Sequence, residues 1–296
     1  MNDLSIQTLV FHLLLLSQRM VKNMNTRNNE VLGLGKRRMF AATAMFLTLG
    51  QLCLKADELT VTTANGLGAD AYVQGSTLTG NYGDSGVITT RDGLGNAANV
   101  YKDYFRFDLQ NSGFDLSTAT SVTFSFVALT ARTGTGFGFY ILPDGLPGDA
   151  SPSTTGWQEL GITYENAPGN PAGGTATTFI TTSPGDENGN YVTSVGTLTL
   201  NTTAGATVTF TSASLLAALQ NDTNGFLTIA MLRTDTAGIV QIASKENTGG
   251  YQFPTLTINA TPVPEPASFS LILLVVAALG FRYFPHRNRA RSDAQG

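Results

Sequence analysis

The sequence has one cysteine and two histidines among 296 residues, which limits the kinds of active site that it can build. Cys53 lies in an apolar run near the N-terminus, and His12 and His286 lie near the two ends. The chain between residues 57 and 266 therefore excludes a disulfide, a nucleophile activated by histidine, and a zinc site of histidine and cysteine. About 210 residues still suffice for one all-β core without disulfides.

Positive charge is also scarce in the middle of the chain. Between residues 57 and 281, six Lys and Arg face eighteen Asp and Glu, which gives a net charge of −12. Such a surface repels phosphates, so we expect no nucleic acid partner. Carboxylates can instead bind divalent cations, and calcium is the candidate structural cofactor.

Asp70 and Glu246 are the candidate calcium ligands. They come from the two ends of the predicted domain, which lie side by side when a β-sandwich closes. A calcium ion bound by these carboxylates and by backbone oxygens would tie the two ends together. The alternative is that Glu246 pairs with Lys245 or caps a turn.

The last thirty or so residues consist of a rigid turn, an uncharged apolar run and a basic tail. The run over 267–281 covers about 22 Å as a helix, against roughly 30 Å of hydrocarbon in a bilayer. With snorkelling arginines and Tyr283 at its end, it predicts a transmembrane helix over 267–284 and a cytoplasmic tail over 285–296. This order of parts resembles the PEP-CTERM sorting signal of Gram-negative envelope proteins. The residues that carry the resemblance are Val263, Pro264, Glu265, Pro266, Arg282, Arg287 and Arg289.

The resemblance implies that a membrane enzyme of the exosortase type processes the tail. The protein would be anchored in the membrane through the C-terminal helix first, and would then reach the cell surface or the extracellular matrix. Residues 261–266 would be the linker to the helix. The alternative is an ordinary C-terminal membrane anchor without processing.

An export signal is predicted within a leader over residues 1–56. Lys36, Arg37 and Arg38 form a basic segment, an apolar segment follows at about 39–54, and Ala56 is the candidate cleavage residue. Cys53 would be removed with this signal. A second apolar run at 9–16 leaves two interpretations, a long leader or a start codon placed too early. We favour the second, with the true start at Met20, Met24 or Met39, because a signal peptide needs one apolar segment.

From residue 58 onward the chain alternates short runs rich in Thr, Val and Phe with Gly and Asn, a pattern typical of antiparallel β structure. The pattern predicts an all-β, two-sheet sandwich with one short helix over 214–220, capped by Ser212 or Ser214. The apolar positions of 105–109 and of 122–126 alternate, so these two faces should meet in the core. Strands are predicted near 59–63, 71–74, 87–91, 100–109, 121–130, 137–142, 161–164, 177–181, 195–200, 206–210, 226–232, 239–243 and 255–259.

The alternation of residues along the strand near 100–109 also indicates candidate carbohydrate-binding residues. Lys102, Tyr104 and Arg106 lie on the face opposite the phenylalanines of their strand, and Tyr82 and Arg91 come from neighbouring strands or loops. Aromatic rings stack on sugar faces and arginine forks a carboxylate, so this set suits an acidic polysaccharide. The alternative is a solvent-facing row with a cross-strand Arg/Asp pair.

Several local motifs occur in the order that one family shows. They include the run from Trp157 to Pro168, the Ser244, Lys245 and Glu246 triplet, and the Pro254, Thr255 and Leu256 triplet. Residues 57–260 thereby resemble the DNRLRE domain. The resemblance implies a jelly-roll β-sandwich similar to carbohydrate-binding modules. The loops at 143–153 and 182–190 are longer than the family pattern.

We expect this protein to have no enzymatic activity. The remaining catalytic candidate is a pair of carboxylates, Glu159 and Glu165, which would share a face only on a fully extended strand, and solvated side chains are the favoured interpretation. Trp157 is expected to be a core residue more than a sugar platform. The sequence thus indicates an exported, non-enzymatic envelope or matrix protein that binds or supports extracellular polysaccharide. The alternatives are a structural surface protein without a ligand and an accessory domain of polysaccharide degradation.

Overall fold

The computed structural model describes residues 57–93, 95–152, 156–170, 177–181, 191–235 and 238–262. The predicted signal segment within 1–56, the sorting residues from Val263 onward, the helix over 267–284 and the tail over 285–296 lie outside these ranges. Within the described ranges, no helix is long and apolar enough to cross a membrane.

Strands make up most of the regular structure, which confirms the all-β class. The strands are β1 Asp57–Thr62, β2 Ala69–Gln74, β3 Val87–Arg91, β4 Tyr101–Asp108, β5 Phe114–Asp115, β6 Ser121–Ala128, β7 Arg132–Ile141, β8 Thr193–Thr202, β9 Ala206–Phe210, β10 Phe226–Arg233, β11 Ile239–Ala243 and β12 Thr255–Pro262. One α-helix is described, α3 Ala213–Gln220, together with three short 3-10 turns, η1 Ala97–Asn99, η2 Leu116–Thr118 and η3 Pro147–Asp149.

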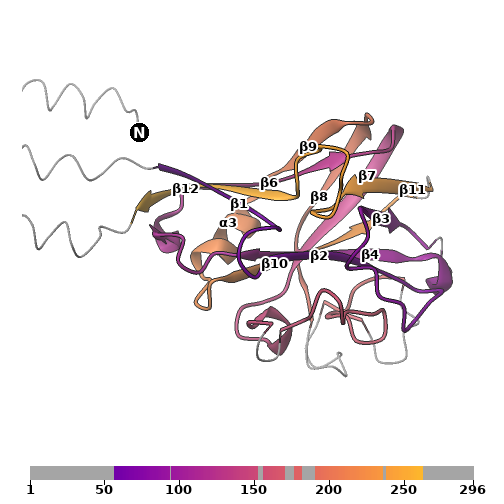
Figure 1. The fold of residues 1–296 in the computed structure, drawn as a ribbon, viewed down its shortest axis with the longest axis horizontal. Coiled ribbons are helices and arrows are strands. Elements are labelled where there is room, and N and C mark those ends of the chain that lie inside the picture. Colours follow the sequence, from indigo (N-terminus) through magenta and orange to yellow (C-terminus); the bar gives the residue numbers. More distant parts are fainter. Residues whose placement is uncertain are drawn as a thin grey trace, which may run out of the picture. The chain divides into compact units, whose positions relative to one another are not determined.

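The described strands pair antiparallel in one continuous sheet that folds back on itself (Figure 1). Its order is β1-β12-β6-β11-β3-β4-β10-β7-β8, with β9 added to β6, β2 to β4 and β5 to β12. β4 and β6 are not neighbours in this order, yet the rings of Phe105 and Phe124 lie 5.1 Å apart. The two strands therefore belong to opposite layers of a sandwich-like arrangement.

The main core lies between these two layers, as the alternation predicts. Phe124 packs its ring against those of Phe105, Phe107, Phe126 and Phe139. All five side chains are at most 1% exposed. Burying a side chain of this size contributes roughly 1.5–3 kcal/mol, so this aromatic group is a main source of the stability of the sandwich.

Helix α3 covers one end of this core. Ser212 is its N-cap, and the Ser212 hydroxyl accepts a hydrogen bond from Leu215 N at 3.0 Å. This decides between the two capping serines in favour of Ser212. Leu215 and Leu219, one turn apart, are fully buried. Gly225 then adopts φ +77° in the turn to β10, a conformation that L side chains rarely adopt.

A second core lies on the outer side of the layer that contains β2, β4 and β10. Trp157, Ile162, Tyr164 and Phe179 cover this side and pack with Tyr104. Two predicted strands, near 161–164 and 177–181, are wrong because the chain there forms turns and irregular structure. The alternating apolar residues pack onto the sheet from outside instead of pairing with one of its edges. We call residues 156–170 and 177–181 the covering segments.

Candidate functional site

The row expected on the outer side of β4 is buried under the covering segments. Lys102 and Tyr104 are 0% exposed, and Arg106 is 3% exposed. The three side chains do lie on the face opposite the phenylalanines, as predicted. The expectation that they face solvent is wrong, and so is the alternative of a solvent-facing row, because the alternation within a strand does not reveal what packs on its outer face.

Arg106 is held by backbone carbonyls and an indole ring. Its guanidinium donates hydrogen bonds to Leu67 O, at 2.9 Å, and to Trp157 O. The same group lies 4.6 Å from the centroid of the Trp157 ring. Burial lowers the pKa of Arg106 to about 10, which still leaves it charged at neutral pH. Trp157 is 6% exposed, so it is a core residue, as expected.

Lys102 and Tyr104 attach the covering segments to β4. The Lys102 ammonium donates to Thr178 O at 2.7 Å and to the Asn170 side-chain oxygen at 2.5 Å. The Tyr104 hydroxyl donates to Pro168 O at 2.8 Å. Burial lowers the pKa of Lys102 to about 7. The polar atoms of this row thus make hydrogen bonds inside the protein.

Tyr82 and Arg91, the other two carbohydrate-binding candidates, are partly exposed. The rings of Tyr72 and Tyr82 stack with centroids 4.5 Å apart and an interplanar angle of 13°. The Tyr101 ring lies 6.0 Å from that of Tyr72. Arg91 pairs in register with Tyr101 across β3 and β4, which places both side chains on one face. We call Tyr72, Tyr82 and Tyr101 the tyrosine cluster; sequence reasoning found only Tyr82.

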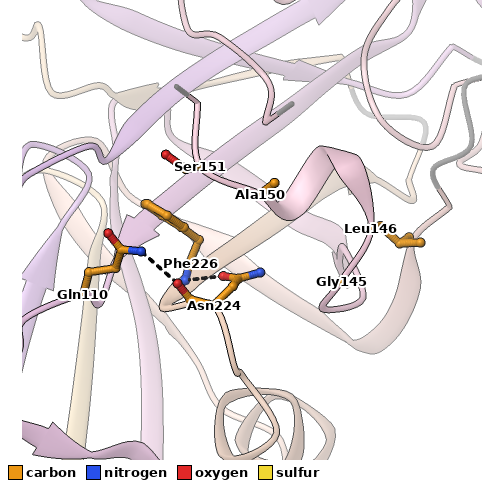
Figure 2. Close-up of a pocket in the computed structure, with 7 residues that line it drawn as sticks. All are labelled: Gln110, Gly145, Leu146, Ala150, Ser151, Asn224 and Phe226. Atoms are coloured by element: carbon orange, nitrogen blue, oxygen red, sulfur yellow. Dashed lines mark hydrogen bonds between the residues drawn. The ribbon is translucent and has the colours of Figure 1, made fainter. Parts of the chain in front are cut away.

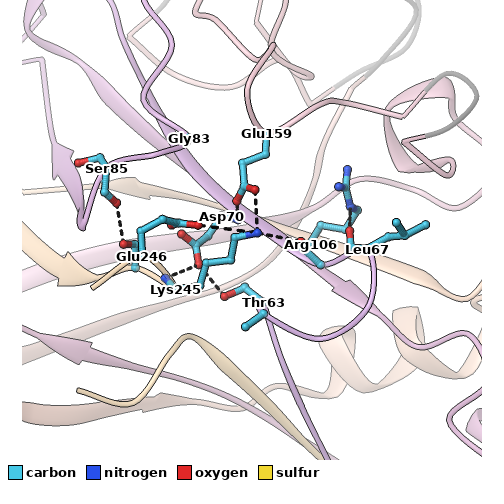
Figure 3. A network of polar contacts seen from close by, with 12 residues as sticks. Thr63, Leu67, Asp70, Gly83, Ser85, Arg106, Glu159, Lys245 and Glu246 are labelled. Atoms are coloured by element: carbon cyan, nitrogen blue, oxygen red, sulfur yellow. Dashed lines mark hydrogen bonds and ion pairs between the residues drawn. The ribbon is translucent and has the colours of Figure 1, made fainter. Parts of the chain in front are cut away.

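Asp70, Glu159 and Glu246 form a second group, which we call the acidic triad (Figure 3). One carboxylate oxygen from each lies within 4.8 Å of the other two. Asp70 is on β2, Glu159 belongs to a covering segment, and Glu246 lies in the turn after β11. A hydrogen bond from Asn247 N to Ser244 O, at 3.2 Å, closes that turn. The structure therefore joins three segments that are distant in sequence.

Lys245 is the cation next to the acidic triad. Its ammonium lies 2.7 Å from Glu159 Oε2 and 3.9 Å from Glu246 Oε1, and it donates to Gly68 O at 3.2 Å. Asp70 Oδ2 accepts hydrogen bonds from Thr63 Oγ1 at 2.5 Å and from Lys245 N at 3.0 Å. Two buried carboxylate oxygens, Asp70 Oδ1 and Glu246 Oε2, have no hydrogen-bond donor.

Burial makes the carboxyl groups of Asp70 and Glu246 hard to ionise. Burial is the main cause that raises the pKa of Asp70 from 3.8 to about 7; the neighbouring Glu246 and Glu159 act in the same direction, while hydrogen bonds from Thr63 and Lys245 oppose the change. The pKa of Glu246 is also raised, mainly by burial and next by Glu159. Three ionised carboxylates and one ammonium would leave two negative charges in this partly buried site, so a further cation would be stabilising there.

The predicted neighbours Asp70 and Glu246 are thus brought together, while their binding of calcium stays a prediction. Glu246 also lies near Lys245, the pairing that was the alternative. Sequence reasoning missed Glu159 as the third member, since it considered Glu159 only together with Glu165. Glu159 and Glu165 would share a face only on an extended strand, but the chain between them forms turns, and Glu165 is exposed.

The loop that carries Tyr82 is bound to the same segments. The Asn81 side chain donates to Glu159 O at 2.8 Å and to Ile162 O at 2.7 Å. The Ser244 hydroxyl donates to Ser85 O at 2.6 Å from the other side. The acidic triad and the tyrosine cluster therefore share one supporting loop.

A pocket of about 340 Å³ opens elsewhere, between the 143–151 loop and the start of β10 (Figure 2). Figure 2 shows Gln110 bonded to Asn224, whose side-chain oxygen accepts from Phe226 N at 2.7 Å. The Asn224 amide also donates to Asp144 at 2.7 Å and to Asp149. Burial raises the pKa of Asp149 to about 8. These polar groups mainly bind the loop to the turn before β10.

Comparison with known proteins adds no assignment. The sequence matches no protein-family model and no curated protein.

Proposed function

We propose that residues 57–262 form the exported, non-enzymatic domain of a cell-envelope or matrix protein, and that this domain binds an acidic extracellular polysaccharide. Export is supported by the basic and apolar segments before residue 57. Delivery by an exosortase-type enzyme is supported by the PEP-CTERM-like order of the residues from Val263 onward. The two facing β layers support a DNRLRE-like jelly roll as the detailed topology.

The tyrosine cluster is the observation that carries the polysaccharide proposal. Tyr72, Tyr82 and Tyr101 are partly exposed and packed against one another, so their rings are held in place before a ligand arrives. Sugars bind aromatic rings through their apolar C–H faces. Arg91 lies beside Tyr101 and can bind a uronic carboxylate through its planar guanidinium. Lys102, Tyr104 and Arg106 have no place in this version of the site, because they are buried.

Binding of the purified full chain to acidic and neutral polysaccharides, measured by affinity electrophoresis, tests the proposal. We expect the parent protein to be retarded by uronic-acid polymers, and Tyr82→Ala and Arg91→Ala to lose most of this retardation. Tyr251→Ala is the matched control, because Tyr251 is 41% exposed and lies outside the cluster. Thermal unfolding of each variant shows whether its fold is kept.

Three results would contradict the proposal or a part of it. Equal retardation of Tyr82→Ala, Arg91→Ala and the parent would remove the tyrosine cluster from the binding site. Absence of retardation by every polymer would favour the structural surface protein without a ligand. Turnover of a polymer by the parent protein would contradict the non-enzymatic assignment.

A further inference from the structure

The acidic triad lacks enough hydrogen-bond donors for its oxygens. Asp70 is 1% exposed, and its Oδ1 is buried without a partner, as is Glu246 Oε2. A buried polar atom without a partner is destabilising, and more so when it is charged. Two such atoms in one group of three carboxylates therefore indicate that a binding partner belongs there.

Lys245 alone does not supply enough hydrogen-bond donors or positive charge for the three carboxylates. Its ammonium is bonded to Glu159 Oε2 and Gly68 O, and it reaches Glu246 Oε1 at the longer distance of 3.9 Å. It leaves both orphaned oxygens without a donor. The Lys245 side chain is 17% exposed, so a modest rotation can take the ammonium out to solvent.

We infer that a divalent cation of the Ca²⁺ type binds among Asp70, Glu159 and Glu246, and that it displaces the Lys245 ammonium from Glu159. The proposal is independent of polysaccharide binding. The ligands are all oxygens, which selects a hard cation over zinc or copper. The oxygens lie no more than 4.8 Å apart. Two oxygens on opposite sides of a Ca²⁺ ion are separated by roughly 4.6–5.2 Å, so the triad can close on this ion with little movement.

The bound ion would crosslink β2, a covering segment and the turn after β11. These segments also hold the 81–86 loop through Asn81 and Ser85. An ion that binds only the folded state stabilises it by mass action. We therefore expect calcium to act as a structural crosslink that reaches beyond its three ligands.

The test uses the purified full chain, treated with EDTA and then titrated with CaCl₂ or MgCl₂. With free Ca²⁺ at roughly 100 times its Kd, we expect the thermal midpoint to rise by about 5–10 °C. Asp70→Asn and Glu246→Gln should lose this rise. Glu58→Gln, an exposed change on β1 outside the triad, should keep it.

Lys245→Met separates an ion site from a purely internal ion-pair network. If Lys245 competes with the ion, its removal increases the calcium affinity several-fold, as measured by isothermal titration calorimetry. A parent protein that shows no heat of binding and no thermal shift up to about 10 mM Ca²⁺ overturns the inference, since extracellular calcium modules bind in the range of roughly 0.1–1 mM. A thermal shift that persists in both Asp70→Asn and Glu246→Gln overturns the assignment to this triad.

Discussion

The backbone N–H of Asp70 donates a hydrogen bond to Glu159 Oε1 at 2.9 Å, across a sequence separation of 89 residues. The bond joins β2, which pairs with β4, to a covering segment on the outer side of the same layer. Arg106 makes a second connection between these parts, because its guanidinium bonds both Leu67 O and Trp157 O. The covering segments are therefore an integral part of the domain.

Arg106→Ala should destabilise the domain by about 2–4 kcal/mol in urea unfolding. The change leaves two carbonyl oxygens without their donor and removes the cation–π contact with Trp157. Arg106→Lys keeps the charge but not the planar fork, so it should recover less than half of the loss. An Arg106→Ala protein as stable as the parent would show that these bonds contribute no net stability.

Phe124→Ala should reduce the free energy of unfolding by about 3–5 kcal/mol. Phe124 is fully buried on β6 and contacts rings of the opposite layer, Phe105 on β4 and Phe139 on β7. Phe124→Leu leaves a smaller cavity and should cost less. Urea midpoints of the two variants give the comparison, and equal losses would contradict a close-packed site.

Ser212→Ala should cost about 1 kcal/mol of stability, because the Leu215 N–H loses its capping oxygen. Ser214→Ala, two positions later in the exposed first turn, should be neutral or stabilising by up to about 0.5 kcal/mol. Guanidinium unfolding measures both variants. A larger loss of stability in Ser214→Ala than in Ser212→Ala would show that Ser212 is not the capping residue.

Asp149 should make stability depend on pH. Burial raises its pKa from 3.8 to about 8, with Asp222 and Asp144 acting in the same direction and the Asn224 hydrogen bond opposing. The folded state therefore holds the proton more tightly than the unfolded state, so this contribution is complete below pH 3.8 and is lost as the pH rises through 8.

Asp149→Asn tests this sign, because asparagine resembles the protonated acid. Relative to the parent, the variant should become more stable as the pH is raised from about 4 to 8. The comparison needs urea midpoints of both proteins across that range. Parallel pH profiles would contradict a raised pKa for Asp149.

The sequence predicts the inner core well, because a strand with one face buried between two layers has an apolar residue at every second position. The alternation of Phe105 and Phe107 with polar residues, matched by Val122, Phe124 and Phe126, fixes which faces meet. The helix with Leu215 and Leu219 also follows from local signals, a capping serine and an apolar stripe.

The outer face of β4 was not predictable in the same way. Lys102 and Arg106 are typical surface residues, and nothing in their own strand shows that Trp157 and Tyr164 cover them. The residues of the covering segment alternate like a strand, although turns bonded by side chains such as Asn166 decide its path. Glu159 was missed as a partner of Asp70 for the same reason, since tertiary packing alone brings them together.

The pairing of β1 with β12 has a mechanical consequence. Asp57 lies opposite Ala260, and β12 is paired on its other side with β6. Tension between residues 57 and 262 would therefore peel β1 from β12 one pair at a time, starting at Asp57, and would need little force at each step. Tension between residue 262 and the body of the domain would instead load the β12–β6 hydrogen bonds together in shear. The β12–β6 pairing is therefore the stronger point of attachment under load.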